Sequence, residues 1–288
     1  ETPGGYYTGA VRVSVEAPHN GTRLRYTTDG SLPDRTSPPY TRPLRFTQNT
    51  VFKIRAFDNL HLPSRVTTQT YLFDPAPSVP TVCISADPEA LFDETKGLMS
   101  KGPNADEAFP YVGANFWKNT ELPAHVELME STGLSGIDQD VGFRIFGAFS
   151  RGMAKKSFRI VARSKYGPDR FEYPLFPEKE LESVKSFVIR QSGQDAYKTR
   201  FRDALMTHLI ADSGIDYQAH RTVVLYLNGQ YWGLYNIREK INADFIADNH
   251  NIRTEDVSIL RANGAPDHGS NDNYHRMLNT MRARDMSS

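Results

Sequence analysis

The sequence has a single cysteine, no net charge and no long apolar run. With Cys83 alone, neither an intramolecular disulfide nor a cysteine-based zinc site can form, and its place in VPTVCIS predicts a buried free thiol. The 34 basic and 34 acidic side chains cancel, so electrostatics gives no support for nucleic acid or an anionic membrane as the main partner. No stretch of about 18 apolar residues occurs, so we expect no transmembrane segment.

Several catalytic and targeting motifs are also missing. The eight histidines include no pair four residues apart around a carboxylate, and there is no G-x-S-x-G nucleophile motif. The start, ETPGGYYTGA, has neither the basic nor the apolar part of a signal peptide, so we expect a soluble chain or a trimmed piece of an exported one. With 11% aromatic and 24% charged residues in 288, the composition indicates a globular protein, and the length favours two domains.

Residues 1–78 consist of short β-rich segments separated by turn residues. VRVSVEA, LRYTTDG, VFKIRAF and TTQTYLF are divided by NG, DG and PP, which predicts a small β-sandwich. The alternation in VFKIRAF, residues 51–57, predicts a strand buried on one face only. The proline-rich stretch DPAPSVPTV then predicts a linker, and we place the domain boundary near residue 78.

This block resembles the Ig-like module at the C-terminal end of chitobiases and β-hexosaminidases. The resemblance is carried by Tyr26, Thr28, Asp29, Gly30, Pro33, Ser37 and Tyr40. Such modules are accessory, so the resemblance says little about the function of this part; a sandwich that contacts glycan or a neighbouring domain belongs to the non-catalytic interpretation given below.

The second region, from residue 79, mixes strands and helices. Phe201, Leu205 and Leu209 recur every four residues before Gly214, which predicts a helix over 198–213. The segment TVVLYLNGQYWGLYNIREKI predicts a hairpin turning at residues 228–229, with Tyr226 facing Tyr231 and Leu225 facing Trp232. Asn242 is expected to cap a short helix, NADFIADNH.

The stretch FGAFSRGMAKKSFRI, residues 146–160, places glycines and basic residues between two strand-like segments. A Walker-type phosphate loop is excluded because the Lys-Ser pair comes too late and a strand, not a helix, follows. A β-hairpin with a small-residue tip remains, like the hairpin with which protein kinases cover the phosphates of ATP. Strand parity puts Lys156 on the apolar face with Phe158 and Ile160, and Lys155, Ser157 and Arg159 on the opposite, outward face. Since a buried cation needs a partner, Lys156 is the phosphate candidate; a merely solvated basic face is the alternative.

The order of the segments gives a more specific indication. The succession PTVCISADPEALFD, GANF, VGFRIFGAFSR, KKSFRI, YPLFP, FVIRQSGQD, TRFRDAL and LNGQYWGLYNIREKI resembles the spore-coat protein H (CotH) kinase family over residues 79–288. The resemblance implies an atypical kinase-like fold that binds ATP with a divalent metal such as Mg²⁺ and phosphorylates serine in proteins. The expected fold class is α+β, with an Ig-like sandwich before a β-rich kinase-like region truncated at its C-terminal side.

The family also implies roles for individual residues. Gly147, Ser150 and Arg151 correspond to the phosphate-covering turn, Lys156 to the nucleotide-contacting strand, and Glu239 to the connection near the adenine. Asp203 is the only acid in the first turns of the expected helix, so it could pair with the lysine; a surface couple with Arg202 is the alternative.

Two essential aspartates of the family are not found. They lie further C-terminal, one before an Asn-containing segment and one in a Trp-Asp-x-Asp block, and neither block occurs here. Because phosphoryl transfer needs acids that hold the metal and orient the acceptor, this chain by itself is expected to be inactive, with no catalytic or metal-ligating residue to name. The rival interpretation is a non-catalytic cell-surface binding or scaffold protein. Secretion or surface display is implied only through the family and the module.

Overall fold

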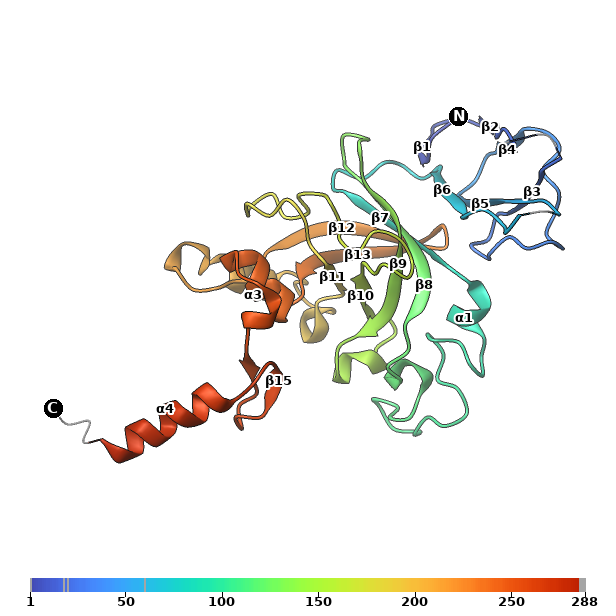
Figure 1. Cartoon of the computed structure of the whole chain (residues 1–288). Coiled ribbons are helices and arrows are strands. Elements are labelled where there is room, and N and C mark those ends of the chain that lie inside the picture. The colour runs from blue at the N-terminus through green and yellow to red at the C-terminus, as the bar shows by residue number, and fades with distance from the viewer. Residues whose placement is uncertain (1, 18, 20, 60, 285–288) are drawn as a thin grey trace.

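The computed structural model describes residues 2–17, 19, 21–59 and 61–284, and it contains two β-rich units (Figure 1). The N-terminal unit packs against one side of a larger barrel, and a helical segment projects from the opposite side (Figure 1). Between the last strand of the first unit and the first strand of the second, residues 73–80 contain no helix or strand.

The N-terminal unit is a small sandwich of two sheets. The larger sheet has the order β1 (Gly5–Tyr6), β6 (Thr67–Leu72), β5 (Thr50–Phe57), β3 (Arg23–Thr27). The smaller sheet pairs β2 (Val11–Val13) with β4 (Leu44–Phe46). Aromatic side chains of both sheets meet in the core, where the Phe46 ring lies 5.2 Å from Tyr71 and 5.8 Å from Phe52. The predicted sandwich is confirmed.

Strand β5 departs from the prediction of one buried face. Val51, Phe52, Lys53 and Ile54 are all at most 4% exposed, so residues of both parities are covered. The second face is covered because the barrel packs against it: β6 contacts β8, and Thr70 N donates to Glu127 Oε1 at 2.9 Å. The barrel therefore buries a face of β5 that the alternating sequence pattern predicts to be exposed to solvent.

The second unit is a closed seven-stranded barrel with the order β10-β11-β13-β12-β7-β8-β9. The strands are β7 (Thr81–Ala86), β8 (Leu122–Met129), β9 (Ser135–Phe146), β10 (Ser157–Val161), β11 (Ser186–Arg190), β12 (His220–Leu227) and β13 (Gln230–Glu239). All neighbours are antiparallel except β7 and β12, which run parallel. Side chains such as Phe143, Phe158 and Ile237 fill the interior and are fully buried, so the barrel is a packed core rather than a channel. Cys83 on β7 is a buried free thiol, as expected.

The hairpin of β12 and β13 turns at the predicted residues. Asn228 has φ 48° and Gly229 has φ 74°, as a type I′ turn requires. Tyr226 faces Tyr231 as predicted, but Leu225 faces Gly233 and not Trp232. The reason is a bulge between Leu225 and Tyr226, which shifts the register by one residue.

Helices are short and lie outside the barrel. The α-helices are α1 (Pro88–Phe92), α2 (Arg202–His208), α3 (Ala243–His250) and α4 (Asp272–Ala283). The remaining elements are the 3₁₀ turns η1 (Asn115–Trp117), η2 (Phe149–Gly152), η3 (Gly193–Asp195), η4 (Ala211–Ser213) and η5 (Thr254–Asp256), with the small hairpin β14 (Ile259–Leu260) and β15 (Pro266–His268). None of the helices in the described part of the chain combines the length and apolar character needed to cross a bilayer.

Two helices test the sequence predictions. Helix α3 begins where expected, because Asn242 accepts a hydrogen bond from Phe245 N at 3.1 Å. Helix α2 is shorter than the predicted 198–213, because a separate 3₁₀ turn follows it before Gly214, which has φ 74°. The apolar spacing of four therefore continues past the end of the regular α-helix.

Candidate functional site

The loop between β9 and β10 is built from the stretch that the sequence singles out. Its 3₁₀ turn η2 covers residues 149–152, and Gly147 has φ 109°, in the region that favours glycine. A Cβ atom added at Gly147 would lie 2.5 Å from Ser150 Oγ. Gly147 and Ser150 therefore lie together in this turn.

Replacing Gly147 by alanine is expected to lower the free energy of unfolding by roughly 1 to 3 kcal/mol, through the strained backbone and the clash with Ser150. Gly9→Ala is the matched control, because an added Cβ there has open space around it. Urea unfolding of both variants tests this. Equal stability of the two variants would contradict the tight turn.

Arg151 is anchored to the protein by its guanidinium group. Its Nε donates to the carbonyl of Gly147 at 2.5 Å, and Nη1 donates to the carbonyl of Phe116 at 3.0 Å. The side chain therefore ties the loop to η1. Burial and then the nearby Arg144 lower the pKa of Arg151 from its usual value, because no carboxylate offsets them.

Lys156 points inward as strand parity predicts. It is 5% exposed, and its strand-mates Phe158 and Ile160 are fully buried. Its Nζ donates to the carbonyls of Arg151, at 2.7 Å, and Met153, at 3.0 Å, and lies 3.8 Å from the centre of the Phe116 ring. Burial lowers the pKa of Lys156 to about 8. Backbone carbonyls and an aromatic ring thus satisfy the buried cation, so it does not need an anion.

An open pocket of about 450 Å³ lies beside Lys156. Its lining includes the aromatic residues Phe92, Tyr111, Phe116 and Trp232, together with Lys101 and Lys156. The Lys101 Nζ stacks on the Tyr111 ring at 3.5 Å. Aromatic faces with cations at the rim are compatible with a flat, charged ligand.

Glu239 does not join this group. On the barrel it pairs with Phe187, which also pairs with Ile160, so it lies toward the opposite end of β10 from Lys156. Its carboxylate accepts from Ala219 N at 2.8 Å and lies 2.7 Å from Lys179 Nζ. Gly147, Ser150, Arg151 and Lys156 are therefore brought together, and Glu239 is held apart with its carboxylate already engaged.

The outer face of the same sheet carries a row of arginines. Arg159 on β10 lies directly opposite Arg144 on β9. Neither forms an ion pair with a carboxylate among the described residues, because the nearby Glu121 and Asp244 pair with Arg163 and Lys185 instead. Arg159 Nη2 donates to Ser186 Oγ at 3.4 Å, but its Nε is buried without a hydrogen-bond partner among the described residues. Burial, followed by repulsion from Arg144 and Arg163, lowers the pKa of Arg159 from its usual value, and the carboxylates of Asp244 and Glu121 offset this only in part. The pair therefore leaves an excess of positive charge on this face, which favours an anion.

Two further arginines on this face already have a counter-ion. Asp203 in the first turn of α2 lies 2.8 Å from Arg190 Nε and also contacts Arg238. Asp203 therefore serves the outer face and does not pair with Lys156, which faces inward. Arg202, the other suggested partner, lies 3.7 Å from Asp195 instead.

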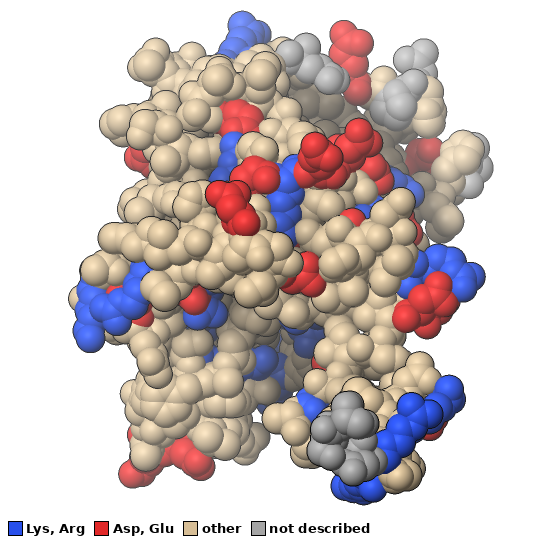
Figure 2. All heavy atoms as spheres, turned by 90° about the vertical axis from the view of Figure 1, so that its left-hand side faces the viewer, with Lys and Arg blue, Asp and Glu red and all other residues tan. Residues whose placement is uncertain are grey.

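The sequence pattern places Arg159 outward, with a merely solvated charge as one interpretation. In the structure Arg159 is only partly exposed, and its Nη2 donates to Ser186 Oγ at 3.4 Å. The signal that could have found it is the cross-strand pairing of two arginines, which destabilises a bare sheet. Over the face that carries α3 and α4, Figure 2 shows basic and acidic side chains interspersed, so the exposed charge there forms no extended patch of one sign.

Comparison with known proteins gives two family matches. Residues 143–285 match the family described as CotH kinase protein, and residues 2–68 match the chitobiase/β-hexosaminidase C-terminal domain. No curated protein matches the chain significantly. The chain thus carries a CotH kinase region behind a chitobiase-type module, as the sequence resemblance indicated. All the candidate residues from Arg144 to Glu239 fall inside the first match.

Proposed function

We propose that the CotH kinase region of this chain binds a nucleoside triphosphate, ATP by family resemblance, with its phosphates on the outer face of β9 and β10. Arg144 and Arg159 are the residues proposed to contact the phosphate oxygens. The observation that carries the proposal is their direct pairing across the sheet without a carboxylate partner among the described residues. Phosphate is the natural ligand of such a pair, because guanidinium groups bind its oxygens through charged, often paired hydrogen bonds.

The loop from Gly147 to Lys156 is assigned a neighbouring role. Because Lys156 is held by two carbonyls and Arg151 by three carbonyl contacts, these cations stabilise the loop and contribute positive potential. The aromatic pocket beside Lys156 is the alternative position for the nucleotide, in which Lys156 takes the phosphate as first predicted.

The divalent ion fits this site only when it is coordinated by the bound nucleotide. Among the described residues, no group of three histidine, cysteine or acidic side chains lies close enough together near Arg159 to hold a metal. An ion bound there would therefore take its ligands from phosphate oxygens and water, as Mg²⁺ commonly does. We propose nucleotide binding only, because transfer of a phosphoryl group to a serine hydroxyl needs further acidic residues.

The experiment compares arginine variants. Arg159→Ala is expected to weaken the binding of Mg·ATP, measured by isothermal titration calorimetry, about tenfold or more, since a hydrogen bond to a charged group contributes roughly 1.5–3 kcal/mol. Arg45→Ala is the matched control, because Arg45 faces Arg12 in the same cross-strand manner but both are exposed on the sandwich.

The binding results decide where the nucleotide binds. Loss of binding in Lys156→Ala with normal binding in Arg159→Ala would move the nucleotide to the aromatic pocket. No binding of Mg·ATP by the full chain would favour the non-catalytic scaffold. We extend the proposal to a secreted or cell-surface protein with serine-bearing protein partners, and the family match supports a protein substrate only in general terms.

A further inference from the structure

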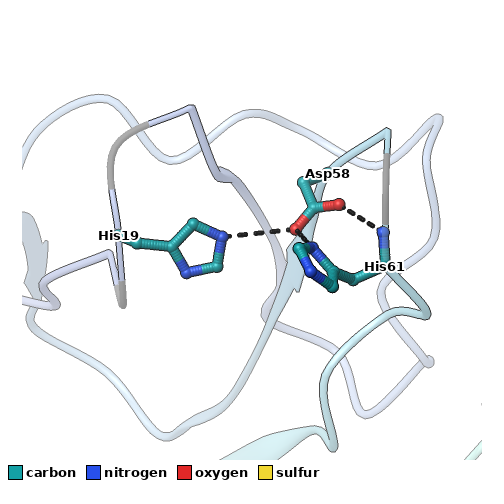
Figure 3. A group of neighbouring side chains, drawn as sticks. All are labelled: His19, Asp58 and His61. Atoms are coloured by element: carbon teal, nitrogen blue, oxygen red, sulfur yellow. Dashed lines mark hydrogen bonds and ion pairs between the residues drawn. The ribbon is translucent and has the colours of Figure 1, made fainter.

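A separate group of ligand-bearing side chains lies on the sandwich. His19, Asp58 and His61 converge between two loops, and their ligand atoms all lie within 4.8 Å of one another (Figure 3). We propose that they form a binding site for a divalent transition-metal ion, with zinc as the expected occupant. This inference is independent of the nucleotide proposal, which concerns the other unit of the chain.

The sheet register explains why the three residues meet. Arg23, the first residue of β3, pairs with Phe57, the last residue of β5. The loop that precedes β3 carries His19, and the loop that follows β5 carries Asp58 and His61. Antiparallel pairing therefore brings both loops to the same edge of the sheet.

The distances are close to those of a metal site without its ion. His19 Nε2 lies 3.3 Å and His61 Nδ1 lies 2.8 Å from the same carboxylate oxygen, Asp58 Oδ2. Donor atoms bound tetrahedrally at about 2.0–2.1 Å from zinc are separated by about 3.3 Å. The contact between His19 and Asp58 already has this spacing, the contact between His61 and Asp58 is 0.5 Å shorter, and the ligand atoms of the two histidines lie within 4.8 Å of each other.

The ligand types select the class of metal. Two imidazoles and one carboxylate suit zinc and its neighbours in the transition series, whereas Ca²⁺ and Mg²⁺ prefer oxygen ligands alone. Asp58 Oδ1 accepts from His61 N at 2.6 Å, which orients the carboxylate with Oδ2 toward both rings. The two imidazole side chains are 55% and 67% exposed, so water can complete the coordination from outside.

One basic side chain borders the site. Arg35 Nη2 donates to the main-chain carbonyl of Asp58 at 3.1 Å. A guanidinium group this close opposes a cation held by charge alone, whereas an ion with strong nitrogen coordination is affected less. The expected effect of the bound ion is to join the two loops and stabilise the sandwich.

The test uses the full chain after removal of metal with a chelator. Titration with Zn²⁺ in a calorimeter is expected to give one ion per chain, and Co²⁺ is expected to give the visible absorption of a tetrahedral site. His61→Ala and His19→Ala are each expected to weaken zinc binding by roughly tenfold or more, because each removes one of three protein ligands. Both side chains are exposed, so the variants should fold normally, which circular dichroism checks.

His250→Ala is the matched control. His250 Nε2 lies 3.0 Å from Asp216 Oδ2, a similarly exposed histidine–aspartate pair that belongs to no group of three ligands among the described residues. Unchanged zinc binding in this variant, with loss in the other two, would support the site. Absence of stoichiometric zinc binding, or normal binding by both His61→Ala and His19→Ala, would overturn it.

Discussion

Replacing Glu239 by alanine is expected to lower the free energy of unfolding by about 3 to 5 kcal/mol. Glu239 is 4% exposed and lies 2.7 Å from Lys179 Nζ, whose side chain is 10% exposed. The substitution leaves a buried ammonium group without its counter-ion and removes an acceptor from Ala219 N and from Asn249. Denaturant unfolding followed by tryptophan fluorescence measures the loss, because Trp117 and Trp232 both belong to the barrel unit.

Glu255→Ala is the control for an acid in an exposed ion pair. Glu255 lies 3.4 Å from Arg253, with both side chains about 70% exposed, at 68% and 72%. The expected change is within about 0.5 kcal/mol. A Glu239→Ala variant that is as stable as the wild type but has lost Mg·ATP binding would contradict the structural role. It would instead support the nucleotide contact that the family resemblance implies for Glu239.

The parts of the fold that follow from local chemistry could be predicted. The Asn228-Gly229 dipeptide fixes a turn because both residues tolerate positive φ, and Asn242 starts a helix because its side chain accepts from the backbone three residues on. Short alternating segments likewise predicted the sandwich. In the turn and at the start of the helix, the determining atoms lie within a few residues of one another, so no distant contact is needed.

Features set by distant contacts were missed. Lys53 looks like a solvent-facing strand residue, yet it is 3% exposed because another unit packs over it. The bulge after Leu225 and the early end of α2 were also missed, because the hydrophobic spacing of these segments continues through both positions.

In the candidate site, too, locally determined features could be predicted and features set by distant contacts could not. Parity correctly placed Lys156 inward and Arg159 outward, since side-chain direction is a property of the strand itself. What each cation contacts depends on the rest of the fold. Carbonyls of its own loop satisfy the inward Lys156, while the outward Arg159 lies opposite a second arginine and lacks a partner at Nε among the described residues. Burial alone was therefore a poor guide to which cation needs a ligand.

The interface between the two units contains an ionisable cluster with a definite pH dependence. His125 on β8 is 7% exposed and contacts Asp138 and Asp140, each at 2.9 Å, and Asp138 in turn accepts from Gln69 of the sandwich. Burial acts to lower the pKa of His125, but the two hydrogen-bonded carboxylates, together with the charge of Glu127, outweigh it and raise the pKa to about 9. The folded protein therefore holds this proton at pH values where the unfolded chain releases it.

Stability is accordingly expected to fall as the pH rises from 6.5 toward 9, by about 1 to 2 kcal/mol after allowance for the partial exposure of both aspartates. The full contribution is present below pH 6.5. Lys53 has the opposite effect on the pH dependence of stability. Burial lowers the pKa of Lys53 to about 8, so its buried charge destabilises the folded protein below that pH, and this destabilisation is relieved as the pH rises above 8. The difference between the wild type and His125→Gln in urea unfolding from pH 6 to 8 isolates His125, because Lys53 and His220 are common to both proteins. His125→Gln should remove the fall in stability with pH, whereas His250→Gln, at an exposed pair, should leave the slope unchanged. A slope that survives His125→Gln would show that the charge of this histidine does not stabilise the interface.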